Sequence, residues 1–252
     1  MLCLGWVAPP LFNIMGAHIK VLGSGSSGNC LVVCNGNCDT LIVDAGIPFN
    51  DILFGCGYEL SKVRGVLVSH QHLDHLKSAH NFIEYGYNVY GNESVCQVLP
   101  KCKALTKSVR LQGFKVQTFP LVHNVPNNAF VIDTADNTRI LYVTDTEYTP
   151  CIVRNVNYAV VECNYDMDFM LERIGDGYVP KSRYENHQSL EKCIEYLKRI
   201  KHDRLNGIIL WHLSSGNIDA KKALDRVKEE LCMDNVWIAQ KGLEIETSNE
   251  PF

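Results

Sequence analysis

The chain has 252 residues, of which 46% are hydrophobic and 21% charged, and its formal net charge is −4. This composition is typical of one large globular domain, and the length is enough to bury a substantial core. The mild acidity argues against indiscriminate coating of nucleic acid, but not against a local basic groove.

Residues 1–15 are expected to be an N-terminal extension, and residues 16–252 to form one hydrolase domain. The apolar start lacks the basic residues of a signal peptide and is too short to cross a membrane, and no other run is long or apolar enough. The eleven cysteines include no C-x-x-C spacing. Cys30, Cys34 and Cys38 have weak zinc character, but reduced thiols in a cytoplasmic protein are the simpler interpretation.

Hydrophobic periodicity predicts two halves, each containing strands and then helices. Strands are predicted at 18–22, 30–34, 40–43, 66–69, 109–111, 116–119, 129–133, 139–144, 158–162, 207–210 and 236–239. Helices are predicted at 48–54, 76–85, 92–99, 189–200 and 220–231. This order favours an α/β sandwich of two sheets.

A glycine-serine loop, residues 23–28, follows the first predicted strand. Its backbone N–H groups and hydroxyls suit an oxyanion, so Ser26, Ser27 and the following Asn29 are candidates for substrate binding. The loop lacks the lysine of a P-loop. A tight hairpin loop is an equally good interpretation.

The most informative motif is His70-Gln71-His72-Leu73-Asp74-His75, directly after the apolar run 66–68. Imidazole nitrogens and carboxylate oxygens suit zinc and other first-row metals. Side chains alternate along an extended segment, so His70 and His72 point the same way and can hold one ion. Asp74 and His75 follow after the chain turns and can face a second ion.

The motif resembles the signature of the metallo-β-lactamase superfamily. That resemblance implies a four-layer αβ/βα sandwich of two mixed sheets with outer helices, and metals at one edge. It also implies further stations in a fixed order, each ending an apolar run: Asp44, the motif at 70–75, His123, Asp145 and His212.

A narrower resemblance, to the YycJ/VicX/WalJ group, rests on segments 23–29, 144–146, 162–166 and 212–214. Members of that group resemble exonucleases that degrade DNA from the 5′ end. The group usually has a histidine where this chain has Tyr165, and Gly-His-Leu-Ser where this chain has residues 186–189, Asn-His-Gln-Ser. Both departures are expected near the mouth of the site.

The resemblance implies two divalent ions, Zn²⁺ or Mn²⁺ with Fe²⁺ as a further candidate. One would be held by His70, His72 and His123, the other by Asp74, His75 and His212, with Asp145 bridging them. Two such ions can acidify a bridging water to a hydroxide nucleophile and stabilise charge on phosphoryl oxygens. Asp74 is therefore also expected to take part in catalysis.

Four further residues are candidates for supporting roles. Asp44 can orient a ligand imidazole, or it can cap the turn before Gly46. His187 can donate a proton to the leaving oxygen, or it can be a polar residue at a helix entry capped by Ser189. Glu162 and Asn164 end a strand and can support the ligands or line the mouth.

Basic residues with nearby tyrosines can track a nucleic-acid strand. Lys181 and Arg183 are the best candidates for phosphate contacts; the other lysines fit a solvated helix face. The favoured function is a 5′ DNA exonuclease or related phosphodiesterase. DNA is the expected substrate, and no membrane partner is expected. The alternatives are a small-molecule hydrolase of a cyclic phosphodiester, thioester or lactam, and a non-catalytic metal-binding regulator.

Overall fold

The computed structural model describes residues 17–174, 179–181 and 184–247 and contains two seven-stranded sheets. The first sheet has the order β14-β1-β2-β3-β4-β5-β6. Its strands are β1 His18–Gly23, β2 Cys30–Cys34, β3 Thr40–Val43, β4 Val63–Val68, β5 Val89–Gly91, β6 Lys103–Ala104 and β14 Glu244–Glu246. The expected extension at residues 1–15 lies outside the described residues.

The second sheet has the order β13-β12-β11-β10-β9-β8-β7. Its strands are β7 Ser108–Leu111, β8 Phe114–Leu121, β9 Asn127–Thr134, β10 Arg139–Val143, β11 Tyr158–Glu162, β12 Gly207–Trp211 and β13 Val236–Ile238. Both sheets combine parallel and antiparallel pairs, for example β3 with β4 and β1 with β2 in the first sheet.

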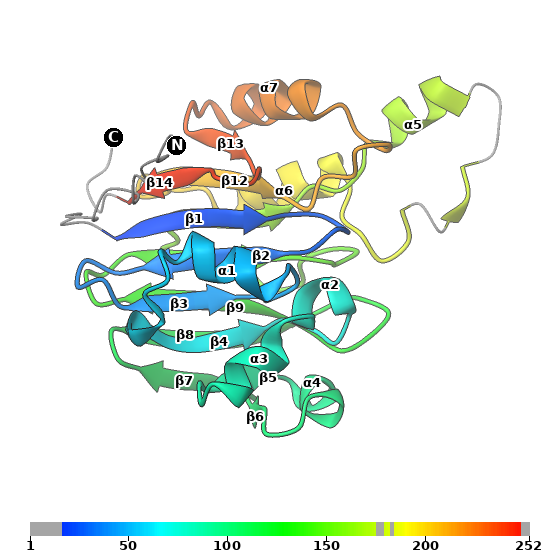
Figure 1. The fold of residues 1–252 in the computed structure, drawn as a ribbon. Coiled ribbons are helices and arrows are strands. Elements are labelled where there is room, and N and C mark those ends of the chain that lie inside the picture. The colour runs from blue at the N-terminus through cyan, green and yellow to red at the C-terminus, as the bar shows by residue number, and fades with distance from the viewer. Residues whose placement is uncertain (1–16, 175–178, 182–183, 248–252) are drawn as a thin grey trace, which may run out of the picture.

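Helices cover the outer faces of both sheets, which gives four layers (Figure 1). They are α1 Phe49–Gly55, α2 Leu73–Leu76, α3 Ala79–Glu84, α4 Glu93–Val98, α5 Met167–Ile174, α6 Leu190–Ile200 and α7 Ala220–Leu231, with a 3₁₀ turn η1 at Leu60–Lys62. The predicted sandwich of two mixed sheets with outer helices is confirmed.

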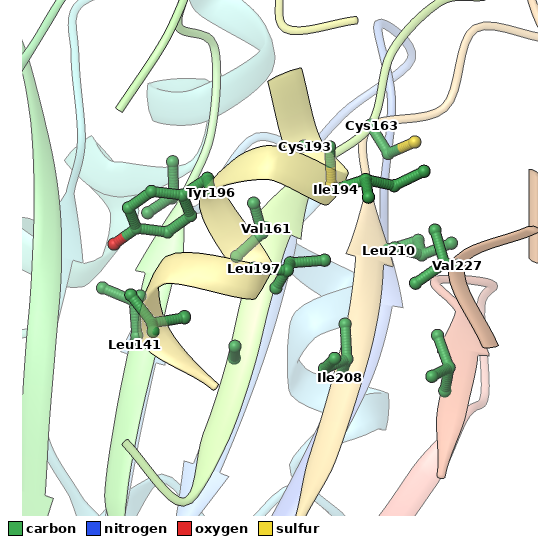
Figure 2. Packing of buried hydrophobic residues seen from close by; sticks show 14 of the residues in the cluster. Leu141, Val161, Cys163, Cys193, Ile194, Tyr196, Leu197, Ile208, Leu210 and Val227 are labelled. Atoms are coloured by element: carbon green, nitrogen blue, oxygen red, sulfur yellow. The ribbon is translucent and has the colours of Figure 1, made fainter. Parts of the chain in front are cut away.

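Three apolar layers hold the sandwich together. The central layer joins the two sheets and includes Leu41 and Leu67 from one side and Phe130 and Trp211 from the other. A second layer lies under α1, α3 and α4. The third lies under α6 and α7, where Figure 2 shows Leu197 of α6 beside the strands of the second sheet. The buried residues of α6 recur at helical spacing and form one apolar face. The Ser189 hydroxyl caps the start of this helix by accepting from Lys192 N–H.

Strand direction determines where the site lies. β3 and β4 run parallel, as do β10, β11 and β12, so their carboxyl ends meet at one edge of the sandwich. β8 is antiparallel to β9, which is antiparallel to β10, so β8 also ends at this edge. We call this edge the rim. In Figure 1, α2 and α5 both lie at the rim end of the molecule.

The structure differs from the predicted elements at several points. The single helix predicted at 76–85 is two short helices, α2 and α3, because the metal motif turns directly into α2. The very short strands β5 and β6 and the helix α5 were not predicted. Strand β14 was also not predicted, because only Ile245 of its three residues is apolar and buried.

Candidate metal centre

Three of the candidate residues adopt a backbone conformation that residues other than glycine rarely adopt. The angle φ is 58° at Asp44, 47° at Asp145 and 56° at His212. These residues come one or two positions after the ends of β3, β10 and β12. Left-handed residues of this kind end an extended run abruptly, and they cluster at functional sites at a cost of about 1–3 kcal/mol each. The strained positions therefore coincide with the rim.

The first donor group combines three imidazoles and one carboxylate: His70, His72, His123 and Asp145. His70 Nε2 lies 3.0 Å from His72 Nδ1, and His123 Nε2 lies 3.3 Å from the same atom. Donor atoms around a tetrahedral zinc ion are roughly 3.4 Å apart, given bonds of about 2.0–2.1 Å. The spacing therefore suits a single small cation.

The second donor group consists of Asp74, His75, Asp145 and His212. His75 Nε2 is 3.4 Å from Asp145 Oδ1 and 3.7 Å from Asp74 Oδ2, and His212 Nε2 is 3.7 Å from Asp145 Oδ1. The other oxygen of Asp145, Oδ2, lies 4.0 Å from His70 Nε2. Asp145 therefore presents one oxygen to each group, and the structure brings all seven predicted ligands together.

One of the buried donor atoms lacks the hydrogen-bond partner that buried polar atoms need. His212 Nε2 is buried and makes no hydrogen bond. Burial opposes a charge on His75, but the carboxylates of Asp145 and Asp44 outweigh it and raise the pKa of His75 to about 10. Burial and the adjacent His75 lower the pKa of His70. Divalent cations would accept the imidazole lone pairs and compensate the carboxylates, so the residues present fit such ions.

Asp44 orients one of these imidazoles. The fully buried carboxylate accepts from Tyr142 Oη at 2.7 Å, from Ser69 Oγ at 3.0 Å and from Ser69 N–H at 2.8 Å. His75 Nδ1 lies 2.7 Å from Asp44 Oδ2, so Nδ1–H donates to it and Nε2 faces the second group. These contacts favour ligand orientation over the turn cap before Gly46.

Glu162 and His187 form a further pair beside the second group. The Glu162 carboxylate is fully buried and lies 2.7 Å from His187 Nδ1 and 3.4 Å from His212 Nδ1. Burial opposes a charge on His187, but the hydrogen bond to Glu162 outweighs it and raises the pKa of His187. Asn164 Nδ2 lies 2.9 Å from His212 Nδ1. Glu162 and Asn164, at the end of β11, therefore both lie against the candidate ligand His212.

Residues 186–188 explain one departure from the YycJ-like pattern. Asn186 has φ of 68°, in the left-handed region where asparagine is tolerated best after glycine, the residue usual at this position. Its carbonyl accepts from His123 Nδ1, which leaves His123 Nε2 for the first group. The fully buried Gln188 amide donates to the Glu162 carbonyl.

The glycine-serine loop packs against the metal motif. A Cβ on Gly46 would lie 1.6 Å from the Asp74 carbonyl oxygen, so only glycine fits where the chain after β3 meets the motif. Asn29, predicted to bind substrate, is fully buried, and its amide lies 3.0 Å from His75 Nε2 and 3.2 Å from the Gly25 carbonyl. Asn29 therefore links the glycine-serine loop to the metal motif and is not exposed to a substrate, whereas Ser26 and Ser27 are exposed.

A cavity of about 740 Å³ adjoins the second donor group. Ser26 and Ser27 line it, as do His187, His212, the loop after β12 and Arg173 of α5. Arg173 was not identified from the sequence. Lys181 is exposed but does not line this cavity, and Arg183 lies outside the described residues. Asp166 caps α5 by accepting from Asp168 N–H, a signal that could have revealed this helix.

Elsewhere in the described part of the chain, the structure gives two simpler results. Cys30, Cys34 and Cys38 do not form a group that could hold a metal ion, and the ten described cysteines are free thiols. None of the helices in the described ranges has the length and apolar character needed to cross a membrane.

Comparison with known proteins places this site in a family. The family described as the beta-lactamase superfamily domain matches residues 40–208, which include every candidate ligand except His212. The exodeoxyribonuclease YycJ of Bacillus anthracis is 29% identical over 175 residues, which cover 62% of this chain and 66% of that protein.

Solved structures share the fold over nearly the whole chain. The metallo-β-lactamase fold protein YhfI of Bacillus subtilis has a TM-score of 0.73 at 18% identity, with 92% of this chain and 99% of that chain covered. Zinc-bound PqqB of Methylobacterium extorquens has a TM-score of 0.70 at 14% identity, covering 91% and 99%. The short form of human tRNase Z has a TM-score of 0.62 at 13% identity, covering 92% and 99%. With a matching family over most of its length and this fold, the chain belongs to the metallo-β-lactamase superfamily.

Proposed function

We propose that this superfamily hydrolase is a dinuclear-metal phosphodiesterase that removes nucleotides from the 5′ end of DNA. The observation that carries the proposal is the pair of four-residue donor groups that share Asp145. A pair of adjacent cation sites suits in-line displacement at phosphorus, because both the attacking and the leaving oxygen develop charge. A protein that only binds metal has no need for such a pair.

Each donor has a defined task in this proposal. His70, His72 and His123 would hold one ion; Asp74, His75 and His212 would hold the other; and Asp145 would bridge them. When bound, the two ions would supply an activated water and stabilise the phosphoryl oxygens. Asp44 keeps His75 in the tautomer that leaves Nε2 for the second ion.

Asp74 is the most exposed of the three carboxylates involved, with a side-chain exposure of 26% against 0% for Asp44 and 5% for Asp145. Burial works against its charge, but the contact with His212 prevails and lowers the pKa of Asp74. An ionised carboxylate at the open side of the site can accept a hydrogen bond from the attacking water. We assign this catalytic role to Asp74 in addition to ligation.

His187 is the proposed general acid. Its Nδ1–H donates to the Glu162 carboxylate, and within the described residues its Nε2 makes no hydrogen bond. The raised pKa of His187 keeps the ring protonated closer to neutral pH, which a proton donor requires. The His187 side chain is 25% exposed, so the ring is held in place but remains accessible from the cavity. Glu162 positions the ring and does not contact the substrate.

DNA as the substrate is supported by the similarity to the exodeoxyribonuclease YycJ. The cavity beside the second donor group is lined by hydroxyls, amides and Arg173, as a phosphate-bearing strand requires. A small-molecule hydrolase of a cyclic phosphodiester, thioester or lactam is the alternative that an experiment must separate from this proposal.

A substrate panel tests the proposal directly. Purified protein loaded with Zn²⁺, Mn²⁺ or Fe²⁺ is incubated with labelled DNA, bis-p-nitrophenyl phosphate, a thioester and nitrocefin, with Asp145→Ala as the inactive control. We expect stepwise release of nucleotides from the 5′ end and slower hydrolysis of the small diester. DNA that survives with every metal, together with turnover of the thioester or nitrocefin, would contradict the nuclease assignment.

A further inference from the structure

The cavity beside the second donor group extends beyond the candidate metal ligands. Two serine-bearing loops line it: residues 24–27 after β1 and residues 213–217 after β12. Of the candidate ligands only His212 lines it, together with the proposed proton donor His187. The cavity therefore extends from the metal centre on the side of His187.

The lining is suited to an anion. Among the described residues that line the cavity there is no carboxylate, and Arg173 is the only lysine or arginine. The exposed side chains of Ser26 and Ser215 add hydroxyl donors. Arg173 lies one turn after Phe169 on α5, and its guanidinium is 5.4 Å from the Phe169 ring centroid, a cation–π contact that holds it.

A second cavity of nearly the same size provides a comparison. It has a volume of about 720 Å³ and lies at the opposite end of β10 from Asp145. Its wall includes Asp133 beside Arg139, and Arg139 Nε donates to Asp133 at 2.6 Å. Arg139, one of the two arginines that line this second cavity, is therefore already neutralised by a carboxylate, whereas Arg173 has no carboxylate beside it in the wall of the first cavity.

The size of the first cavity limits what can enter. Sites of roughly 300–1,000 Å³ enclose a ligand of drug size. A volume of about 740 Å³ therefore has room for one nucleotide at the end of a strand. A site of this size beside the reacting centre favours attack close to a chain end.

We propose that this cavity holds the leaving nucleotide and that Arg173, with Ser26 and Ser215, binds its 5′-phosphate. The inference rests on the proposed function, because His187 marks the side on which the leaving oxygen lies. Water adds its oxygen to phosphorus, the P–O3′ bond of the terminal nucleotide breaks, and the electron pair stays on O3′, which takes the proton from His187. The strand that remains carries a new 5′-phosphate, which is the group that the cavity recognises in the next cycle.

The first experiment compares single-stranded oligonucleotides of one sequence that carry either a 5′-phosphate or a 5′-hydroxyl. We expect kcat/KM to favour the 5′-phosphate by roughly tenfold to a hundredfold, the range of a charge-assisted hydrogen bond. Arg173→Ala should remove most of this preference, because the 5′-phosphate loses its guanidinium partner. Arg226→Ala is the matched control, because Arg226 is an arginine of α7 that pairs with Glu191 and does not line the cavity.

The second experiment measures binding without catalysis, in metal-free protein. Calorimetry should detect deoxyadenosine 5′-monophosphate but not deoxyadenosine, and Arg173→Ala should weaken nucleotide binding by at least about tenfold. If nucleotide binds in this way but DNA is not cleaved, the exonuclease proposal fails and the phosphate site stands. The phosphate site is overturned if the 5′-phosphate strand and the 5′-hydroxyl strand are cleaved equally fast. It is also overturned if Arg173→Ala slows the cleavage of these two strands by the same factor.

Discussion

At the scale of single residues, the site depends on carboxylates that fix imidazoles. Asp44 holds His75, and Glu162 holds His187, each through an Nδ1 contact of 2.7 Å. The two imidazoles then use Nε2 for different purposes. His75 Nε2 faces the carboxylates of the second donor group, whereas His187 Nε2 is left for a proton transfer. In the proposed mechanism, the same local arrangement therefore serves ligation in one case and catalysis in the other.

His187→Ala separates these two purposes. We expect near-normal metal content, because His187 belongs to neither of the donor groups that share Asp145. The rate on DNA should fall roughly tenfold to a thousandfold, as for loss of a general acid. Metal analysis and single-turnover kinetics on the same preparation check both parts. A lost ion in this variant would make His187 a ligand and refute the assignment.

Glu162→Gln should change the pH dependence of the rate. The Glu162 carboxylate raises the pKa of His187, so the acid form persists above its usual range and activity declines only at higher pH. Without the negative charge the pKa of His187 falls, and the alkaline limb of the profile should move to lower pH. A profile of kcat between pH 5 and pH 10 measures the shift, with circular dichroism as the control for folding. An unmoved alkaline limb would show that another group is the acid.

At the scale of elements, the sequence predicted the strands that deliver ligands better than the short elements around them. The apolar runs before Asp145, Glu162 and His212 are fully buried strands, β10, β11 and β12, and strands of this kind are visible as continuous apolar stretches. In contrast, β5, β6 and β14 have three or fewer residues and depend on pairing with neighbours. Such pairing is tertiary information that local periodicity does not carry.

The loops at the rim were the least predictable part. Asn29 is conspicuous in the sequence beside exposed serines, yet the fold turns it inward against His75. Arg173 lies in a helix of only eight residues, and nothing in the sequence alone connects it to a loop after β12. The grouping of the candidate ligands was predictable because their residue types and order are constrained by chemistry. The residues that line the cavity are determined by how separate loops meet.

Gly46→Ala tests the junction between β3 and the metal motif. The added Cβ would lie 1.6 Å from the Asp74 carbonyl oxygen, so the motif must move. We expect the free energy of unfolding to fall by about 2 kcal/mol or more and metal affinity to fall with it. Gly216→Ala is the matched control, because a Cβ there meets nothing within 4 Å, and its stability should change by less than about 0.5 kcal/mol. Equal denaturation midpoints for the two variants would contradict the packing argument.

At the scale of the whole molecule, the two sheets meet at the metal centre. Asp44 follows β3 of the first sheet and accepts from Tyr142 of β10 in the second sheet. The candidate ligands also come from both sheets, since His70 follows β4 and His212 follows β12. The sandwich architecture was predictable from the motif and the order of elements. This hydrogen bond across the central layer was not, because it joins residues 98 positions apart.

Tyr142→Phe should loosen the link between the sheets at the site. Removal of the hydroxyl leaves the Asp44 carboxylate with one donor fewer, so His75 is held less firmly. Metal affinity should fall roughly tenfold to a hundredfold, the usual effect of losing such a supporting contact. Metal titration of the apo-protein measures it, and Tyr196→Phe, in the apolar layer under α6, serves as the control. Unchanged affinity in Tyr142→Phe would mean that Ser69 alone positions Asp44.

The central claim is that one carboxylate, Asp145, joins two metal sites in one fold, and native mass spectrometry tests it most directly. The account predicts two divalent ions in each wild-type chain. It predicts at most one ion in Asp145→Ala, with the circular dichroism spectrum of a folded protein. A wild-type chain that binds a single ion at saturation, or an Asp145→Ala chain that still binds two, would contradict the account.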